Sequence, residues 1–121
     1  MTMKNNGTRA TVAAICAAVV NRRGYSYVHD FTANSSRHVT IKVNDNKVDA
    51  YDYAASASID GSVPGDLYHY GENTHIEMKI SNNKVEGFHY GSSDFYEATV
   101  SGTSVEFYDF GTSNFYFYEV S

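Results

Sequence analysis

The chain repeats a unit of about twenty residues, and this repetition limits its fold more than any other feature. Residues 71–90 read GENTHIEMKISNNKVEGFHY, and residues 91–110 read GSSDFYEATVSGTSVEFYDF. Residues 34–53 match the first of these without a gap, and a shortened copy begins at Gly111. Self-similarity at a fixed period indicates that one supersecondary unit is used several times.

Each unit has the pattern of a β-hairpin. In the 34–53 unit, apolar residues alternate from Val39 to Val43, a polar tip follows at Asp45 and Asn46, and the alternation resumes at Val48. Period two on both sides of a short polar tip predicts two antiparallel strands with Val43 opposite Val48. The other complete units have their tips at Asn82-Asn83 and Gly102-Thr103. Asn, Asp and Gly tolerate the positive φ that such turns require.

The segment before the repeats predicts a buried helix. Ala10 to Val20 contains small and apolar residues with Thr11 as the only polar one, so no charged face lies between Arg9 and Arg22. A helix over about 9–23 that is apolar all round must be buried. Because its many alanines let strands approach closely, we expect a sheet that curls around it.

The expected fold class is α+β, with an N-terminal helix packed against or enclosed by a strongly curved antiparallel meander of about nine strands made of tandem hairpin repeats. The chain is expected to be one domain, 1–121, because its length suits a single core. Asp60-Gly61 and the only proline, Pro64, predict a loop or degraded strand in the irregular unit. The expected units are 34–53, a degenerate 54–70, 71–90, 91–110 and a partial 111–121.

Composition excludes several classes of function. Nine Lys and Arg against fourteen Asp and Glu give a formal charge of -5 with no basic run, so nucleic acid is not an expected partner. The apolar run is too short for a membrane span. The sequence has no recognisable zinc spacing, phosphate loop or nucleophile motif, so we expect no metal, no cofactor and no catalytic residues. We therefore expect a binding protein in preference to an enzyme.

The cellular location has two interpretations. Cys16 is the only cysteine and cannot close an internal disulfide, which favours a cytoplasmic protein. Lys4 and Arg9 before the apolar run also resemble the start of a secretory signal, so the protein is exported if residues 1–18 are a signal peptide. Asn21, Arg22 and Arg23 directly after the run are unusual for a signal, and we prefer the native helix.

Aromatic residues form the main candidate interaction site. The chain has eleven Tyr and seven Phe, and the predicted register places a row of rings on the sheet face opposite the helix. Rings of this kind often build protein interfaces or ligand pockets, although they also pack against each other with no further role. The first hypothesis is a non-catalytic binding protein that self-associates, as a homodimer in the simplest case. The candidate residues are Tyr51, Tyr53, Phe88, Tyr90, Phe95, Tyr108 and Phe110.

A second candidate site lies at the rim of the sheet. The middle residue of each Tyr-x-Tyr-like triplet is ionisable, and the register turns these side chains toward the helix. Such residues could line a small-ligand site inside the curved sheet, with hydrolase-like chemistry as an extension. They lie on alternate strands about 9.5 Å apart, which is too far for neighbours to share an ion unless the sheet closes. The four rim residues are Asp52, His69, His89 and Asp109.

Overall fold

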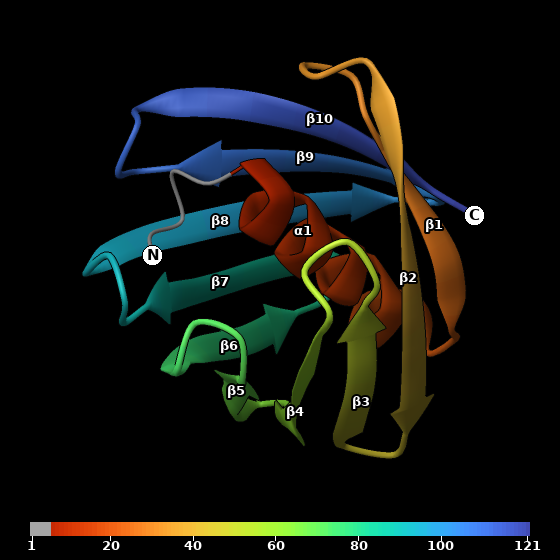
Figure 1. Cartoon of the computed structure of the whole chain (residues 1–121), viewed down its shortest axis with the longest axis vertical. Coiled ribbons are helices and arrows are strands. Elements are labelled where there is room, and N and C mark those ends of the chain that lie inside the picture. The colour runs from red at the N-terminus through yellow and green to blue at the C-terminus, as the bar shows by residue number, and fades with distance from the viewer. Residues whose placement is uncertain (1–5) are drawn as a thin grey trace.

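The computed structural model describes residues 6–121, which form one helix inside a closed barrel of ten antiparallel strands (Figure 1). The strands follow one another round the barrel in chain order, and β1 pairs with β10 to close it. The predicted α+β fold with a curved antiparallel meander is therefore confirmed. The elements are α1 (Asn6–Asn21), β1 (Tyr25–Asp30), β2 (Ser35–Asn44), β3 (Lys47–Asp52), β4 (Ala57–Ser62), β5 (Gly65–His69), β6 (Thr74–Ser81), β7 (Lys84–His89), β8 (Asp94–Ser101), β9 (Ser104–Asp109) and β10 (Asn114–Val120).

The hairpin register is the predicted one. Val43 pairs with Val48, and the same two-residue tip separates the paired residues Ile80 and Val85 of β6 and β7. A third pair, between Val100 and Val105, repeats the geometry in β8 and β9. The first residue of each tip has a left-handed backbone, with φ of 55° at Asp45, 58° at Asn82 and 60° at Gly102. These are residues that accept positive φ at low cost, which is why a polar tip fixes the register.

The helix fills the interior. Every side chain from Val12 to Ala18 is inaccessible to solvent, and the inward-facing side chains of the strands pack around them. The helix lies closest to β1, β2 and β8–β10. Its position at the centre of the barrel, seen in Figure 1, explains why it has no polar face.

The helix ends earlier than predicted. It covers Asn6–Asn21 rather than about 9–23, and Arg22 has a left-handed φ of 55°. The Arg23 amide donates to the Ala18 carbonyl, 3.2 Å away, so Arg22 takes the left-handed position at the helix end that glycine commonly occupies. Gly24 is needed for another reason, because a Cβ there would collide with the Ile41 carbonyl.

The barrel has ten strands rather than about nine, and the 54–70 unit contributes two of them, β4 and β5. The sequence predicted a loop or a degraded strand in the first half of this unit, and the structure has a strand there, β4 (Ala57–Ser62). The Asp60-Gly61 pair lies within β4 and pairs with β5. Residue 61 is glycine because a Cβ there would collide with the Asp66 carbonyl of β5. Pro64 lies in the link between the two strands, after a cis peptide bond.

Close packing around the helix leads to a prediction for Ala14, which is inaccessible at the helix centre. The exchange Ala14→Leu adds three carbons where the strands leave no room, and we expect it to lower the free energy of unfolding by about 1–3 kcal/mol. Urea denaturation followed by circular dichroism measures the change. The control Val20→Leu adds one carbon at the half-buried helix end and should cost less. Equal stability of Ala14→Leu and the wild type would contradict a filled interior.

Candidate functional site at the loop end

Five four-residue loops gather at the end of the barrel where the helix begins, and we call this the loop end. They connect β1 to β2, β3 to β4, β5 to β6, β7 to β8 and β9 to β10. The strand before each loop ends in Asp or His, and the fourth loop residue has a left-handed φ of 51–57°. The strand-ending residues are Asp30, Asp52, His69, His89 and Asp109.

Each strand-ending side chain turns inward and accepts a hydrogen bond from its own loop. Asp30 Oδ1 accepts from the backbone N–H groups of Thr32 and Ala33, at 2.9 and 3.1 Å. His69 Nδ1 accepts from the Glu72 amide at 3.1 Å. Asp Oδ1 and His Nδ1 lie at the same distance along their side chains, so either residue can satisfy the loop's backbone donors. Equivalent bonds occur at Asp52, His89 and Asp109.

The four predicted rim residues are therefore loop caps. Their side chains are buried, with exposed fractions of 0–2%. Closure of the barrel places them around one axis, but among residues 6–121 there is no cluster of three metal-ligating side chains. Asp30 is a fifth member of this set. It was not among the predicted rim residues, because it precedes the first recognised repeat.

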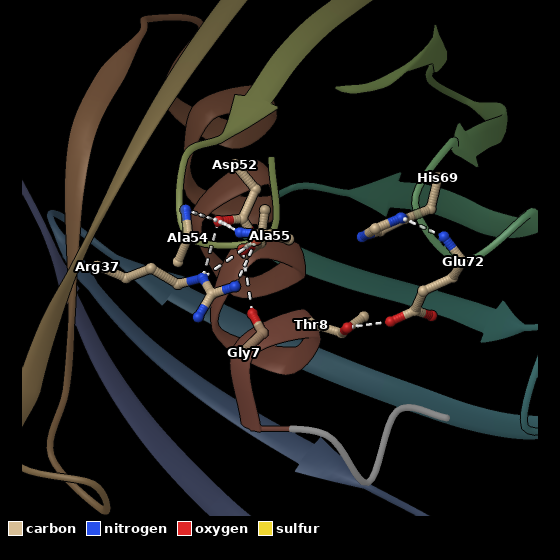
Figure 2. A network of polar contacts seen from close by, with 9 residues as sticks. Gly7, Thr8, Arg37, Asp52, Ala54, Ala55, His69 and Glu72 are labelled. Atoms are coloured by element: carbon tan, nitrogen blue, oxygen red, sulfur yellow. Dashed lines mark hydrogen bonds and ion pairs between the residues drawn. The ribbon is translucent and has the colours of Figure 1, made fainter. Parts of the chain in front are cut away.

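Three residues of the first helical turns contact three different carboxylates. The Thr8 hydroxyl donates to Glu72, Thr11 donates to Asp52 at 2.9 Å, and Arg9 Nε donates to Asp109 at 3.1 Å. The positive end of the helix dipole also favours negative charge here. Figure 2 shows Thr8 and Glu72 side by side near the start of the helix. The network therefore attaches the helix to loops on different sides of the barrel.

Arg9 is a fully buried cation. Its guanidinium lies 3.8 Å from the centre of the Tyr116 ring and pairs with Asp109. Burial raises the pKa of the Tyr118 hydroxyl, with a further rise from Asp30 and an opposing effect of Arg9. Such a buried pair stabilises the fold only when it is well hydrogen-bonded, and removing one partner is costly. The charge at Arg9 thus fixes the helix in one orientation.

Asp52 is held from two sides. Arg37 of β2 donates through Nε and Nη2, with distances of 2.8–3.1 Å to the carboxylate oxygens, and Thr11 approaches from the helix. The two Arg37 nitrogens give the fork geometry that arginine adopts with carboxylates. Figure 2 shows this contact on the opposite side of the helix from His69 and Glu72.

Glu72 connects the two histidines. His89 Nδ1 accepts from the Ser92 amide at 3.1 Å, so the ring proton lies on Nε2 and is donated to Glu72 at 3.0 Å. Burial alone would raise the pKa of Glu72, but hydrogen bonds from His89 and Thr8 hold it below its usual value. Burial lowers the pKa of His69, and nearby Glu72 and Asp52 oppose this effect. In both loop caps the histidine Nδ1 thus accepts a hydrogen bond from a backbone N–H group.

This arrangement offers little chemistry beyond capping. The strand-ending carboxylates and imidazoles are each bonded to a loop amide. Cys16 is buried in the core, and burial raises the pKa of its thiol, so the reactive thiolate is disfavoured. Sequence reasoning missed Glu72, Arg37 and Thr11 as members of the network, because their contacts exist only once the barrel has closed.

The aromatic residues lie on the outside of the barrel, next to the loop end. Tyr53, Tyr90, Phe95 and Phe110 are exposed, whereas the other three predicted face residues are partly covered by neighbouring rings. The partly covered residues are Tyr51, Phe88 and Tyr108. The structure thus brings all seven to the face opposite the helix, and it adds Tyr70, Phe31 and Phe115 as exposed rings at the same end.

The rings are arranged in a repeated pattern. The first residue of four loops packs edge-to-face on the ring two residues before it, at 4.7–4.9 Å between ring centres. In three of these hairpins a third ring completes the group from the next strand, as Phe95 does beside Phe88 and Phe115 beside Tyr108. His75 takes this place beside Tyr68. Such offset contacts between rings contribute to stability and give each ring a fixed orientation.

No protein-family model matches the chain, and no curated protein and no solved structure is significantly similar to it. Within residues 6–121, no helix has both the length and the apolar character that a membrane crossing requires.

The lowered pKa of His69 predicts a pH-dependent stability. The unfolded chain takes up a proton near the ordinary pKa of 6.5, whereas the folded chain does so only at lower pH. Stability from His69 is therefore complete above about pH 6.5 and falls as the pH drops toward the folded pKa. We expect His69→Asn, whose amide oxygen can still accept from the Glu72 amide, to show a smaller loss of stability between pH 7 and 5.

Urea denaturation at a series of pH values measures this loss. The control His75→Asn removes a histidine from the exposed outer face and should keep the wild-type slope. An unchanged slope in His69→Asn would show that the buried ring does not disfavour protonation.

Proposed function

We propose that the protein is a non-catalytic binding protein that self-associates through the aromatic surface on β5–β10. The observation that carries this proposal is the set of six exposed rings on these adjacent strands and their loops. They are Tyr70, Tyr90, Phe95, Phe110, Phe115 and Phe117. Large apolar surfaces exposed on a protein often mark a site that binds another molecule.

The size of the surface suits a second copy of the chain. A ring that is about half exposed offers on the order of 100 Å², so six rings and the partly covered ones between them offer somewhat more than 600 Å². A stable interface needs roughly 800 Å² from each partner. Backbone pairing of edges is not the favoured route, because the barrel is closed. Side-chain contact between two aromatic surfaces is the association that the fold favours.

The rings are well suited to such an interface. Edge-to-face contacts fix Phe88 against Phe95 and Tyr108 against Phe115, both at 4.7 Å between ring centres. Fixed rings lose little conformational entropy on binding, which strengthens association. Tyrosine hydroxyls at the edge can form hydrogen bonds or face water, as is common at protein interfaces.

Removal of two exposed rings tests the proposal. Phe95 is 62% exposed and Phe110 is 48% exposed, so Phe95→Ser with Phe110→Ser should leave the fold intact. Size-exclusion chromatography with light scattering should show a wild-type dimer and a monomeric double variant. Two charged copies repel each other at a net charge of -5, so the wild-type dimer should tighten with added salt.

Ile80→Ser is the matched control, since Ile80 is an exposed apolar residue of β6 outside the aromatic groups. It should dimerise like the wild type. A wild-type monomer at all concentrations would remove self-association from the proposal, and an equal dimer in the double variant would show that other residues form the interface.

The second hypothesis, a ligand site inside the curved sheet, receives less support. The helix occupies the interior, and the four rim residues cap loops. The larger cavities of the described surface are lined mostly by outer-face and loop residues rather than by these four. The geometry therefore supports an external binding surface in preference to an internal one.

We also propose a cytoplasmic location. The segment that a signal peptidase would remove supplies Val12 to Ala18, which form the centre of the core. Mass spectrometry of the chain from its natural host tests this proposal. A full-length chain is expected, and a chain that begins after Ala18 would show export.

A further inference from the structure

One of the four aromatic groups lacks a ring on the strand after its loop. This group is Tyr51 and Tyr53, and its third ring is His38 of the preceding strand β2, which stacks on Tyr53. Each of the strands β3, β5, β7 and β9 carries an aromatic residue that pairs with a residue of the next strand. On three of them the partner is also a ring, in the pairs Tyr68–His75, Phe88–Phe95 and Tyr108–Phe115. On β3, Tyr51 instead pairs with Ser58 of β4. The row of rings is therefore interrupted over β4.

The interruption leaves a groove on the outer face. A cavity of about 450 Å³ lies over β4, with Tyr51 on one side and Tyr70 on the other. Ser56, Ser58 and Asp60 also line it. Because β3 and β5 both neighbour β4, the two tyrosine columns stand roughly 9.5 Å apart, which leaves room for one ring in contact with both.

The remaining walls of the groove carry hydrogen-bonding groups. The Tyr70 hydroxyl lies 3.3 Å from Asp60 Oδ1, and the Asp60 charge raises the pKa of this hydroxyl. Ser58 and Ser56 add two further hydroxyls. A plain apolar ring would leave these groups without partners, which costs binding free energy. An anion is disfavoured by Asp60 and by the net charge of -5.

We infer that this groove binds a neutral pyranose ring of a carbohydrate, stacked between Tyr51 and Tyr70 with its hydroxyls bonded to Asp60 and Ser58. A pyranose has an apolar C–H face that suits a tyrosine ring and hydroxyl donors that suit a carboxylate. The site shares Tyr70 with the aromatic surface on β5–β10, but Tyr51, Ser58 and Asp60 lie outside that surface, and the inference does not depend on self-association.

Titration of the ¹⁵N-labelled protein with methyl β-glucopyranoside, methyl β-galactopyranoside and N-acetylglucosamine, followed by NMR, tests the inference. At least one sugar should shift the amide signals of Tyr51, Ser58 and Tyr70 with millimolar or tighter affinity. The absence of shifts with all three sugars would overturn it. Equal or larger shifts with p-cresol would also overturn it, because the groove would then bind any flat ring.

The exchange Ser58→Tyr supplies the missing ring from the chain itself and should abolish the sugar shifts while the spectrum remains that of a folded protein. Ser62→Tyr adds the same side chain to an exposed position of β4 away from the groove and should bind like the wild type. If Ser58→Tyr does not fold, Tyr51→Ala replaces it, because Tyr51 lies outside the self-association surface, and it should weaken binding at least tenfold. Unchanged binding in the variant that folds would overturn the inference.

The two proposals can fail separately. Light scattering of Ser58→Tyr should give the wild-type mass, because the exchanged residue lies outside the self-association surface. Loss of sugar binding in Phe95→Ser with Phe110→Ser would place the sugar on that surface and would overturn the groove over β4.

Discussion

Burial of a helix on all sides is the constraint on which the rest of the structure depends. Val12 to Ala18 have no access to solvent, and no layer packed on one side could achieve this. A single sheet must surround the helix, and ten strands in chain order close around it. The alanines keep the helix narrow, so the barrel can be filled by one element and a lining of strand side chains. Larger residues such as Phe107 and Tyr96 fill the remaining space.

The polar network at the loop end has two structural roles: it provides hydrogen-bond acceptors for the loops, and it holds the helix in place. Each loop has backbone N–H groups that need acceptors, and Asp or His at the strand end supplies them. The other atoms of Asp52 and Asp109 then receive Thr11 and Arg9 from the helix. An apolar helix could slide or rotate in an apolar barrel, and these directional contacts define its position. Buried charge is retained here for orientation more than for stability.

The sequence predicted the features that depend on local periodicity, namely the strand pairing and the buried helix. Alternation and tip residues determined the pairing of Val43 with Val48, and uninterrupted apolar character determined the buried helix. The sequence failed where a long-range contact changed a local preference. Asp60-Gly61 predicted a loop or a degraded strand, but Gly61 lies in β4, where glycine is needed because β5 approaches closely. Arg22 ends the helix in a conformation for which propensity favours glycine.

The candidate site shows the same division. The register correctly turned Asp52, His69, His89 and Asp109 inward, but their grouping suggested a ligand site where the structure has loop caps. Glu72 could not be assigned a role, because its contacts with Thr8 and His89 join residues 64 and 17 positions apart. These contacts form only when the barrel closes, so the pattern of a twenty-residue repeat cannot predict them.

Repetition also separates the residues that the fold requires from those that it does not. The cap and the left-handed residue recur in all five loops because each loop needs them to turn. The first loop residue is also aromatic in all five, at Phe31, Tyr53, Tyr70, Tyr90 and Phe110, yet about half of each ring remains in water. A ring in that position contributes little to the core, and a polar residue would close the loop equally well. The covered side of each ring packs on a neighbouring ring and contributes to stability, and the exposed side forms the surface on which the proposed self-association rests.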